Sequence, residues 1–286
     1  MTAVAPGPVA LSWQVNGLQM AGLSWGEPTD KPLLALHGWL DNAASFSVIA
    51  PLLVGYRVVA LDLTGHGLSD RRSADASYQI WDDLPEILAV VDALCWDTFD
   101  LMGHSRGAII STLLASACPE RIQRLVLLDA LSPQAVAEQE FSNQMRKFLQ
   151  DKQRLLGRDN RVFATAEEAL AARAGGTLPS AAARLLVERN LRACSGGYTW
   201  TTDPRLRGAS AVKLTAGHTQ SVLEALPMPT LLLMAQEGFT QHPLVAANAQ
   251  RYIKDLELEP VEGGHHFHME AGVIEVAQRI ARFLQG

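Results

Sequence analysis

Apolar and polar positions follow a regular order along most of the chain, in which short apolar runs alternate with longer amphipathic stretches. The short runs cover residues 32–38, 57–63, 98–104, 124–130, 229–235 and 256–262. Continuous apolar runs of this length are typical of parallel strands that are buried on both faces. Several of the longer stretches, such as 81–94 and 106–119, have the pattern of helices. This alternation predicts an α/β fold with a mostly parallel, doubly wound sheet.

The beginning of the chain has a different pattern, because apolar and polar residues alternate there around the pair Asn16-Gly17. Asn-Gly between two alternating runs is the strongest short-range signal for a tight hairpin. The sequence therefore predicts a β-hairpin ahead of the parallel strands.

A long stretch between two of the predicted strands breaks the alternation. From Ser132 to about Leu226 the sequence is helical in character, rich in Ala and Arg, and contains no convincing strand. Because it lies between strands of one sheet, it predicts an inserted helical module and not a second independent domain. Residues 1–131 and 227–286 then form the core, and residues 132–226 the insertion.

Composition argues against several classes of function. The net charge of the 286 residues is −6 without a dense Lys/Arg block, which argues against nucleic acid or an anionic membrane surface as a partner. No apolar stretch approaches the ~18 residues that span a bilayer, and the first residues do not form a signal peptide, so we expect a cytoplasmic protein. Cys95, Cys118 and Cys194 are scattered without a CxxC pair, so neither a disulfide framework nor a zinc knuckle is expected.

The sharpest motif is GHSRG at residues 103–107, which lies directly between a predicted strand and a predicted helix. A GxSxG motif in this context predicts a strained turn that exposes a serine hydroxyl at the carboxyl edge of the sheet. The glycines remove side chains that would clash, and the helix N-terminus offers free N–H groups to a developing oxyanion. Ser105 is therefore the candidate nucleophile.

The strand 32–38 ends in a second candidate element, His37-Gly38-Trp39. A backbone N–H in the loop after this strand is where such a fold needs its other oxyanion donor. We therefore predict an oxyanion hole formed by the backbone N–H groups of Trp39 and Arg106. The Trp39 side chain is expected to narrow the entrance. The Arg106 side chain is expected either to face the pocket and attract an acidic substrate, or to pair with a carboxylate.

With these elements the chain resembles the α/β-hydrolase fold family over nearly its whole length. The matching stretches are HGWLDN, DLTGHGLSD, GHSRG and GGHHFHMEA. The stretch HGWLDNAASF resembles the subgroup of serine hydrolase-like proteins. The resemblance implies a Ser–acid–His triad in that chain order, and a helical cap between strands six and seven, where residues 132–226 fall.

Three histidines close together, His265, His266 and His268, raise the question of a catalytic base or a metal site. In the resembling family, a Gly-His pair ends the last strand and a Glu follows the His by five positions, which implies His265 as the base. The other two are expected to be polar packing or rim residues. No zinc hydrolase signature is present, and a metal site would need ligands from outside this segment, so no metal is expected.

The acid of the triad is less clear from the sequence. In the resembling family, an Asp usually follows the strand read here as 229–235, but Gly238 occupies that position. Glu237 lies one residue earlier and is the alternative acid. Asp129, at the end of the preceding strand, is the preferred candidate, since some family members carry the acid there.

These residues predict a cofactor-independent serine hydrolase that cleaves a small-molecule carboxylic ester through an acyl-enzyme on Ser105, with His265 as base. Two other classes of function stay open. In the first, the same residues hydrolyse a C–C bond, a thioester or an amide, or catalyse perhydrolysis. In the second, the fold serves as a non-catalytic binding protein.

Overall fold

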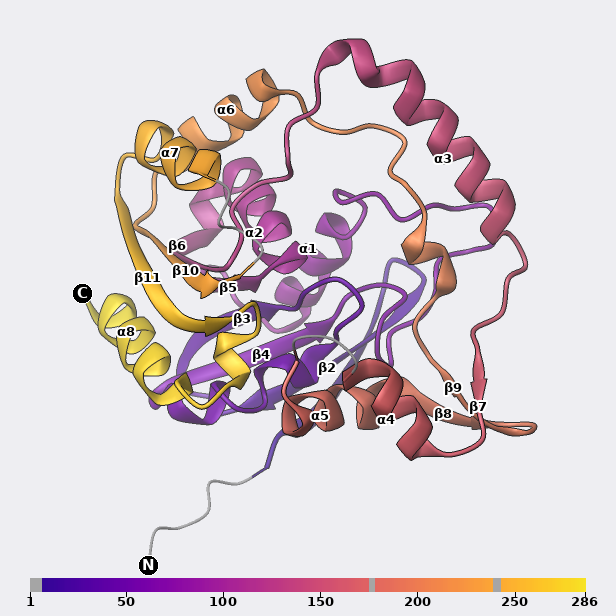
Figure 1. Cartoon of the computed structure of the whole chain (residues 1–286). Coiled ribbons are helices and arrows are strands. Elements are labelled where there is room, and N and C mark those ends of the chain that lie inside the picture. The colour runs from indigo at the N-terminus through magenta and orange to yellow at the C-terminus, as the bar shows by residue number, and fades with distance from the viewer. Residues whose placement is uncertain (1–6, 175–177, 239–242) are drawn as a thin grey trace, which may run out of the picture.

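The chain folds around an eight-stranded sheet with the order β1-β2-β4-β3-β5-β6-β10-β11 (Figure 1). The computed structural model describes residues 7–174, 178–238 and 243–286. The strands are β1 (Val9–Val15), β2 (Leu18–Trp25), β3 (Lys31–Leu36), β4 (Tyr56–Asp62), β5 (Phe99–His104), β6 (Ile122–Leu128), β10 (Thr230–Glu237) and β11 (Leu256–Gly264). Pairing is antiparallel from β1 to β4 and parallel from β4 to β11. The mostly parallel sheet predicted from the sequence is confirmed.

Helices cover both faces of this sheet. One face carries α1 (Leu84–Ala93), α2 (Arg106–Ala117), α6 (Ala216–Glu224) and α7 (Pro243–Tyr252), and the other carries α8 (Val273–Gln285). In β3, Leu34 and Leu36 pack into the first layer, while Leu33 and Ala35 pack into the second. Successive side chains of a strand point to opposite faces, so a strand buried on both sides needs the continuous apolar run seen in the sequence.

The predicted hairpin is formed by β1 and β2, with Asn16 and Gly17 at its turn. Val15 pairs with Leu18, and both turn residues have positive φ, 52° for Asn16 and 79° for Gly17. Asn and Gly tolerate this conformation better than other residues, which is why the pair marks the turn in the sequence.

The segment between β6 and β10 differs in part from the prediction. It contains the helices α3 (Phe141–Leu155), α4 (Ala166–Ala174) and α5 (Ser180–Asn190), followed by α6. It also contains a three-stranded sheet of β7 (Val162–Phe163), β9 (Gly197–Trp200) and β8 (Leu191–Cys194). The expectation of a stretch without strands is therefore wrong. None of these strands exceeds four residues, too few to show an alternating pattern, and β8 begins where α5 ends.

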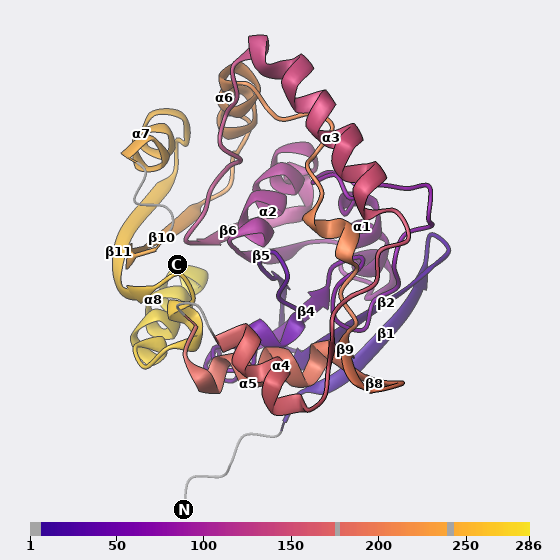
Figure 2. The same ribbon diagram turned by 45° about the vertical axis from the view of Figure 1, so that its right-hand side comes forward.

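The inserted elements lie in two places. In both views α4, α5 and the small sheet lie together, away from α3 and α6 (Figures 1 and 2). The helix α6 packs on α2 and α7. Of the helices in the described part of the chain, none has the length and apolar character needed to cross a membrane.

Candidate active site

Ser105 lies in a strained turn at the carboxyl end of β5, directly before α2. Its backbone has φ 52° and ψ −118°, a combination that costs a non-glycine residue on the order of 1–3 kcal/mol. The Ser105 N–H donates to the carbonyl of Leu128 at 3.0 Å, which ties the turn to the neighbouring strand β6. Strain of this size persists only where the surroundings enforce it, and here the close approach of α2 to the sheet does so.

The two glycines of the motif permit that approach. A Cβ added to Gly107 would lie 2.0 Å from the carbonyl oxygen of Leu36, at the end of β3. A Cβ on Gly103 would lie 2.5 Å from the carbonyl oxygen of Gly107. Because backbone atoms cannot move aside easily, any larger residue would push α2 away from the sheet. This agrees with the sequence expectation that the flanking glycines avoid clashes.

His265 lies in the turn after β11, and its ring meets the carboxylate of Asp129, the residue after β6. Nδ1 of His265 lies 2.5 Å from Oδ2 of Asp129, and Oδ1 of Asp129 accepts the N–H of Ala235 at 2.9 Å. Asp129 is fully buried and has a positive φ of 54°. A carboxylate only accepts hydrogen bonds, so a neutral His265 carries its proton on Nδ1 and has its lone pair on Nε2.

The structure brings Asp129, and not Glu237, to the predicted base. Glu237 is the last residue of β10 and is exposed to solvent. At the next residue, Gly238, an added Cβ would lie 2.2 Å from Oδ2 of Asp129. The missing side chain at Gly238 thus leaves the space that the Asp129 carboxylate occupies. The two positions are adjacent in space, although they follow different strands.

The loop after β3 holds the predicted oxyanion donor Trp39. The Gly38 carbonyl accepts the N–H of Asp41 at 3.2 Å and lies 2.7 Å from Nδ1 of His37. Nε2 of His37 accepts the N–H of Leu63 at 3.0 Å, so the proton of His37 is on Nδ1 and is donated to Gly38. These bonds fix the plane of the Gly38–Trp39 peptide, and with it the direction of the Trp39 N–H.

The second predicted donor, the N–H of Arg106, belongs to the first residue of α2 and has no acceptor within the helix. The Arg106 side chain makes an ion pair with the buried Asp83, with 3.0 Å between Nη1 and Oδ2. Of the two possibilities left open by the sequence, pairing with a carboxylate is therefore the one observed.

His104, which the sequence reasoning missed, connects Ser105 to the His265 turn. Its Nε2 lies 2.8 Å from the carbonyl oxygen of His265, and its ring is fully buried. A carbonyl only accepts, so Nε2 carries a proton. Burial, followed by the nearby histidines, lowers the pKa of His104 well below its ordinary value, so the ring is neutral. The signal was its place directly before the serine in GHSRG.

A second aspartate–histidine pair lies beside the first. Nε2 of His266 is 3.1 Å from Oδ2 of Asp41, while Nη2 of Arg173, from α4, is 2.5 Å from Oδ1. Burial alone would raise the pKa of Asp41, but the hydrogen bond from His266 and the charge of Arg173 hold it well below its ordinary value. His268 is buried against Ser45, with 2.9 Å between Nε2 and Oγ. Both histidines thus have polar partners inside the protein.

The insertion contacts the core near the site at the loop after β3 and at the end of β4. Nε1 of Trp39 donates to the carbonyl of Leu206 at 3.0 Å, and Arg189 pairs with Asp62 at 2.9 Å. A cavity of about 250 Å³ lies between the insertion and the loop after β3. Its walls are formed by Trp39, Leu40, Ala172, Arg173, Asn190, Trp200, Thr202 and Arg207.

Comparison with known proteins agrees with this architecture. The model of the alpha/beta hydrolase fold matches residues 31–272. The chain belongs to the α/β-hydrolase fold family. A serine hydrolase-like protein of Dictyostelium discoideum is 31% identical, over 89% of this chain and 76% of the relative. One of Danio rerio is 32% identical, over 93% and 85%. The resemblance to this subgroup is thereby confirmed.

Among solved structures, the crystal structure of a hypothetical protein from Pseudomonas aeruginosa PAO1 is similar over 98% of both chains. Its sequence is 39% identical and the TM-score is 0.89. The fold and the family are thus established, whereas the substrate has to be argued from the site.

Proposed function

We propose that this α/β-hydrolase is a serine hydrolase that cleaves a small-molecule carboxylic ester through an acyl-enzyme on Ser105. The observation that carries the proposal is the meeting of two strained residues at one edge of the sheet. Ser105 follows β5 and Asp129 follows the adjacent β6, both with positive φ, and His265 bonds to Asp129 from the turn after β11. Energetically costly backbone at adjacent strand ends is typical of a catalytic constellation.

The proposed reaction uses the lone pair on Nε2 of His265. This nitrogen takes the proton of the Ser105 hydroxyl as the oxygen attacks the ester carbonyl, and the Asp129 carboxylate stabilises the resulting imidazolium. The N–H groups of Trp39 and Arg106 bind the oxyanion. His265 then gives its proton to the leaving alcohol, and a water molecule activated by the same ring releases the acid. No step requires a metal or a cofactor.

Residues 132–226 are proposed as the cap that selects the substrate, with the cavity beside Trp39 as part of the binding site. The walls combine two indole rings with the cations Arg173 and Arg207. Arg173 is neutralised by Asp41, but burial and the charge of Arg158 lower the pKa of Arg207. An anionic group on the substrate would relieve this repulsion, so esters with a distant negative charge are expected to bind better than neutral ones.

Covalent labelling tests the proposal directly. A fluorophosphonate probe is expected to label the wild-type protein and to fail with Ser105→Ala. Ser111→Ala is a matched control, because Ser111 is a buried serine of α2 whose hydroxyl donates to the carbonyl of Gly107. Equal labelling of wild type and Ser105→Ala would refute the nucleophile.

A panel of p-nitrophenyl esters of increasing chain length then tests the reaction class, with a neutral and a carboxylate-ended ester of equal length as a pair. Labelling together with turnover of these esters supports a carboxylesterase. Labelling without turnover points to C–C, thioester or amide hydrolysis or perhydrolysis by the same serine. Absence of both points to a non-catalytic binding protein.

A further inference from the structure

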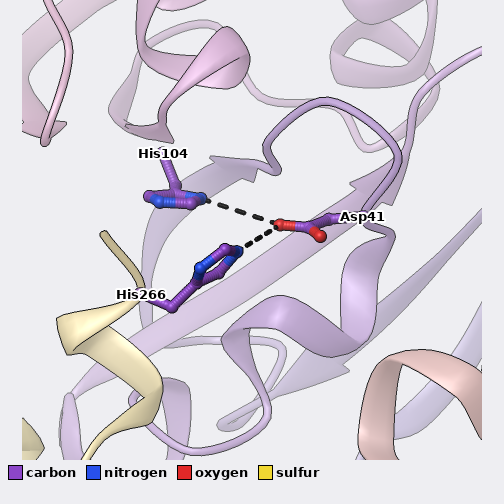
Figure 3. A group of neighbouring side chains, drawn as sticks. All are labelled: Asp41, His104 and His266. Atoms are coloured by element: carbon purple, nitrogen blue, oxygen red, sulfur yellow. Dashed lines mark hydrogen bonds and ion pairs between the residues drawn. The ribbon is translucent and has the colours of Figure 1, made fainter. Parts of the chain in front are cut away.

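Three side chains beside the proposed catalytic residues have the composition of a metal site (Figure 3). Asp41 follows β3, His104 ends β5 and His266 follows β11, and one ligand atom of each lies within 4.8 Å of the others. Two imidazoles and one carboxylate suit Zn²⁺ and neighbouring divalent transition ions. No metal is expected from the sequence, because a site would need ligands from outside the histidine segment; Asp41 and His104 are such ligands in the structure.

The tautomer of His104 leaves one ring nitrogen free to bind a cation. Its Nε2–H is donated to the carbonyl of His265, so Nδ1 of the neutral ring holds a lone pair. Within the described residues Nδ1 has no hydrogen-bond partner, and it faces Oδ2 of Asp41 at 3.9 Å. A buried lone pair opposite a buried carboxylate oxygen is an arrangement of two acceptors, which a cation between them would satisfy.

Two of the three distances between the ligand atoms are near those of a tetrahedral zinc site, and the third pair, His104 with His266, lies within 4.8 Å and closes when an ion binds. Ligands at about 2.0–2.1 Å from zinc lie about 3.4 Å apart at tetrahedral angles. The distances to Oδ2 of Asp41, 3.1 Å from Nε2 of His266 and 3.9 Å from Nδ1 of His104, fall on either side of that value. A Cβ on Gly38 would lie 3.0 Å from His104 Nδ1 and 3.1 Å from Asp41 Oδ2, so the missing side chain leaves space beside both.

His266 and Arg173 complete the arrangement. Without a metal, Nε2–H of His266 is donated to Oδ2 of Asp41, so an ion that binds Nε2 takes the place of this proton and the ring carries its proton on Nδ1, which has no partner among the described residues. Arg173 occupies Oδ1 of Asp41 and leaves Oδ2 to the two histidines. A group that holds the second oxygen of a ligating carboxylate is common around metal sites, since it fixes the orientation of the ligand.

We propose that Asp41, His104 and His266 bind a divalent transition-metal ion such as Zn²⁺, and that the bound ion inhibits the hydrolase. The inhibition rests on the proposed function. His266 is the chain neighbour of His265, and the N–H of Asp41 supports the Gly38 carbonyl of the proposed oxyanion loop. A metal that draws these two ligands together displaces the catalytic base and the oxyanion donor at the same time.

Metal binding is measured first, without any substrate, by calorimetric titration of the chelator-treated full chain with Zn²⁺. One ion per chain is expected, and His266→Gln should weaken binding by about 100-fold or more, since loss of an outer partner alone costs 10–100-fold. His218→Gln is the matched control on the exposed surface of α6 and should bind as wild type. Co²⁺ should give the intense visible absorption of tetrahedral cobalt in wild type and in the control, but not in His266→Gln.

Equal zinc affinity of wild type and His266→Gln, or loss of the ion in His218→Gln, would overturn the site. Asp41→Asn, checked by circular dichroism for its fold, provides a second ligand removal and should also lower the affinity. Mg²⁺, which prefers oxygen ligands, should not compete.

Ester hydrolysis is then compared with and without Zn²⁺, each variant against its own zinc-free rate. Zinc should inhibit wild type and the His218→Gln control, and His266→Gln far less. Absence of ester turnover would count against the proposed function and leave the binding result standing. Binding without inhibition of an active enzyme would overturn the inhibitory role.

Discussion

Two neighbouring histidines each meet a buried aspartate, yet the two pairs are built differently. The carboxylate of Asp129 contacts His265 and a neutral backbone N–H, whereas that of Asp41 is divided between His266 and the guanidinium of Arg173. The charge of Asp41 is thus balanced by a permanent cation before any proton moves. The charge of Asp129 is directed at an imidazole, where it stabilises a proton that arrives during a reaction. The same two residue types therefore suit catalysis in one pair and structural or metal-binding roles in the other.

The largest expected effect comes from Asp129→Asn. An amide in this place favours the wrong tautomer of His265 and cannot stabilise the imidazolium, and in serine proteases the corresponding loss costs about 10⁴ in kcat. By the same mechanism we expect kcat to fall by about 10³–10⁴-fold. The rate is measured with the p-nitrophenyl ester that the wild type hydrolyses fastest. Circular dichroism should show that the fold is retained.

Glu237→Gln is the matched control for this variant, because it makes the same chemical change at the alternative acid. Glu237 is exposed at the end of β10, so the rate should stay within about twofold of wild type. A severe loss in Glu237→Gln with little change in Asp129→Asn would reverse the assignment.

A smaller effect is expected when the acid is moved between the two adjacent strand ends. In Asp129→Gly the carboxylate is lost, and the added change Gly238→Asp places one on the neighbouring strand in the space that Asp129 vacates. We expect the double variant to recover about 10–100-fold of the activity lost in Asp129→Gly, out of a total loss of roughly 10⁴. Gly238→Asp alone should lower activity, since its Cβ would lie 2.2 Å from Oδ2 of Asp129. No recovery in a folded double variant would contradict the idea that the positions are interchangeable.

The strands, the hairpin and the turn at Ser105 could be predicted because their signals are local. A seven-residue apolar run, an Asn-Gly pair or a GxSxG between strand and helix each constrains only its own stretch of backbone. The strands of the inserted sheet were missed because they are short. β8 and β9 form a hairpin of four-residue strands, which is too short to show an alternating pattern, and the two residues of β7 pair with β9 across a long stretch of sequence.

Contacts between loops could not be predicted from the sequence either. Asp41, His104 and His266 meet only because three strands end at the same edge of the sheet, and the partner Arg173 comes from the insertion. The sequence placed Asp129 at that edge, but the space beside Gly238 became visible only in the structure. Which histidine meets which aspartate depends on turn geometry that residue spacing does not fix.

Asp41→Asn should affect stability more than it affects the ester reaction measured without metal. The change leaves Arg173 without its ionic partner, and breaking a buried pair costs about 3–5 kcal/mol, less where one member is partly exposed as Arg173 is. We expect the free energy of unfolding at pH 7 to fall by about 2–3 kcal/mol. Urea unfolding measures it, with Arg154→Gln as control, because Arg154 forms an exposed ion pair with Asp151 and should cost less than about 1 kcal/mol.

The pH dependence of this difference follows from the depressed pKa of Asp41. The ordinary value is 3.8 and the folded value lies well below it, so the folded state binds a proton on Asp41 less readily than the unfolded state does. The stabilisation is therefore complete above pH ~4–5 and is lost as the pH falls through and below 3.8. The gap between wild type and Asp41→Asn should shrink in acid. A gap that grows towards pH 3 would contradict the ionised pair.

The smallest expected effect concerns Asp100 in β5. Asp100 is buried like Asp41 and Asp129 but has no histidine partner in the described part of the chain, so it tests how a buried carboxylate behaves without one. Its Oδ1 has no hydrogen-bond partner among the described residues, and burial raises its pKa from 3.8 to about 6, against the opposing charges of Arg124 and Lys31. The folded state thus binds this proton more tightly than the unfolded state. The stabilisation that comes from this tighter proton binding is complete below pH ~4 and is lost as the pH rises to about 6.

Above pH 6 Asp100 is therefore charged and destabilising, and Asp100→Asn should stabilise the protein at pH 7 by about 1–2 kcal/mol, within a limit of about 3 kcal/mol set by the shift. Near pH 4 the gain should vanish, because the wild-type carboxyl is then neutral in the folded state. Urea unfolding at both pH values measures the difference. An equal gain in stability at pH 4 and pH 7 would contradict this explanation. It would mean that Asp100→Asn acts through packing and not by removing a buried charge.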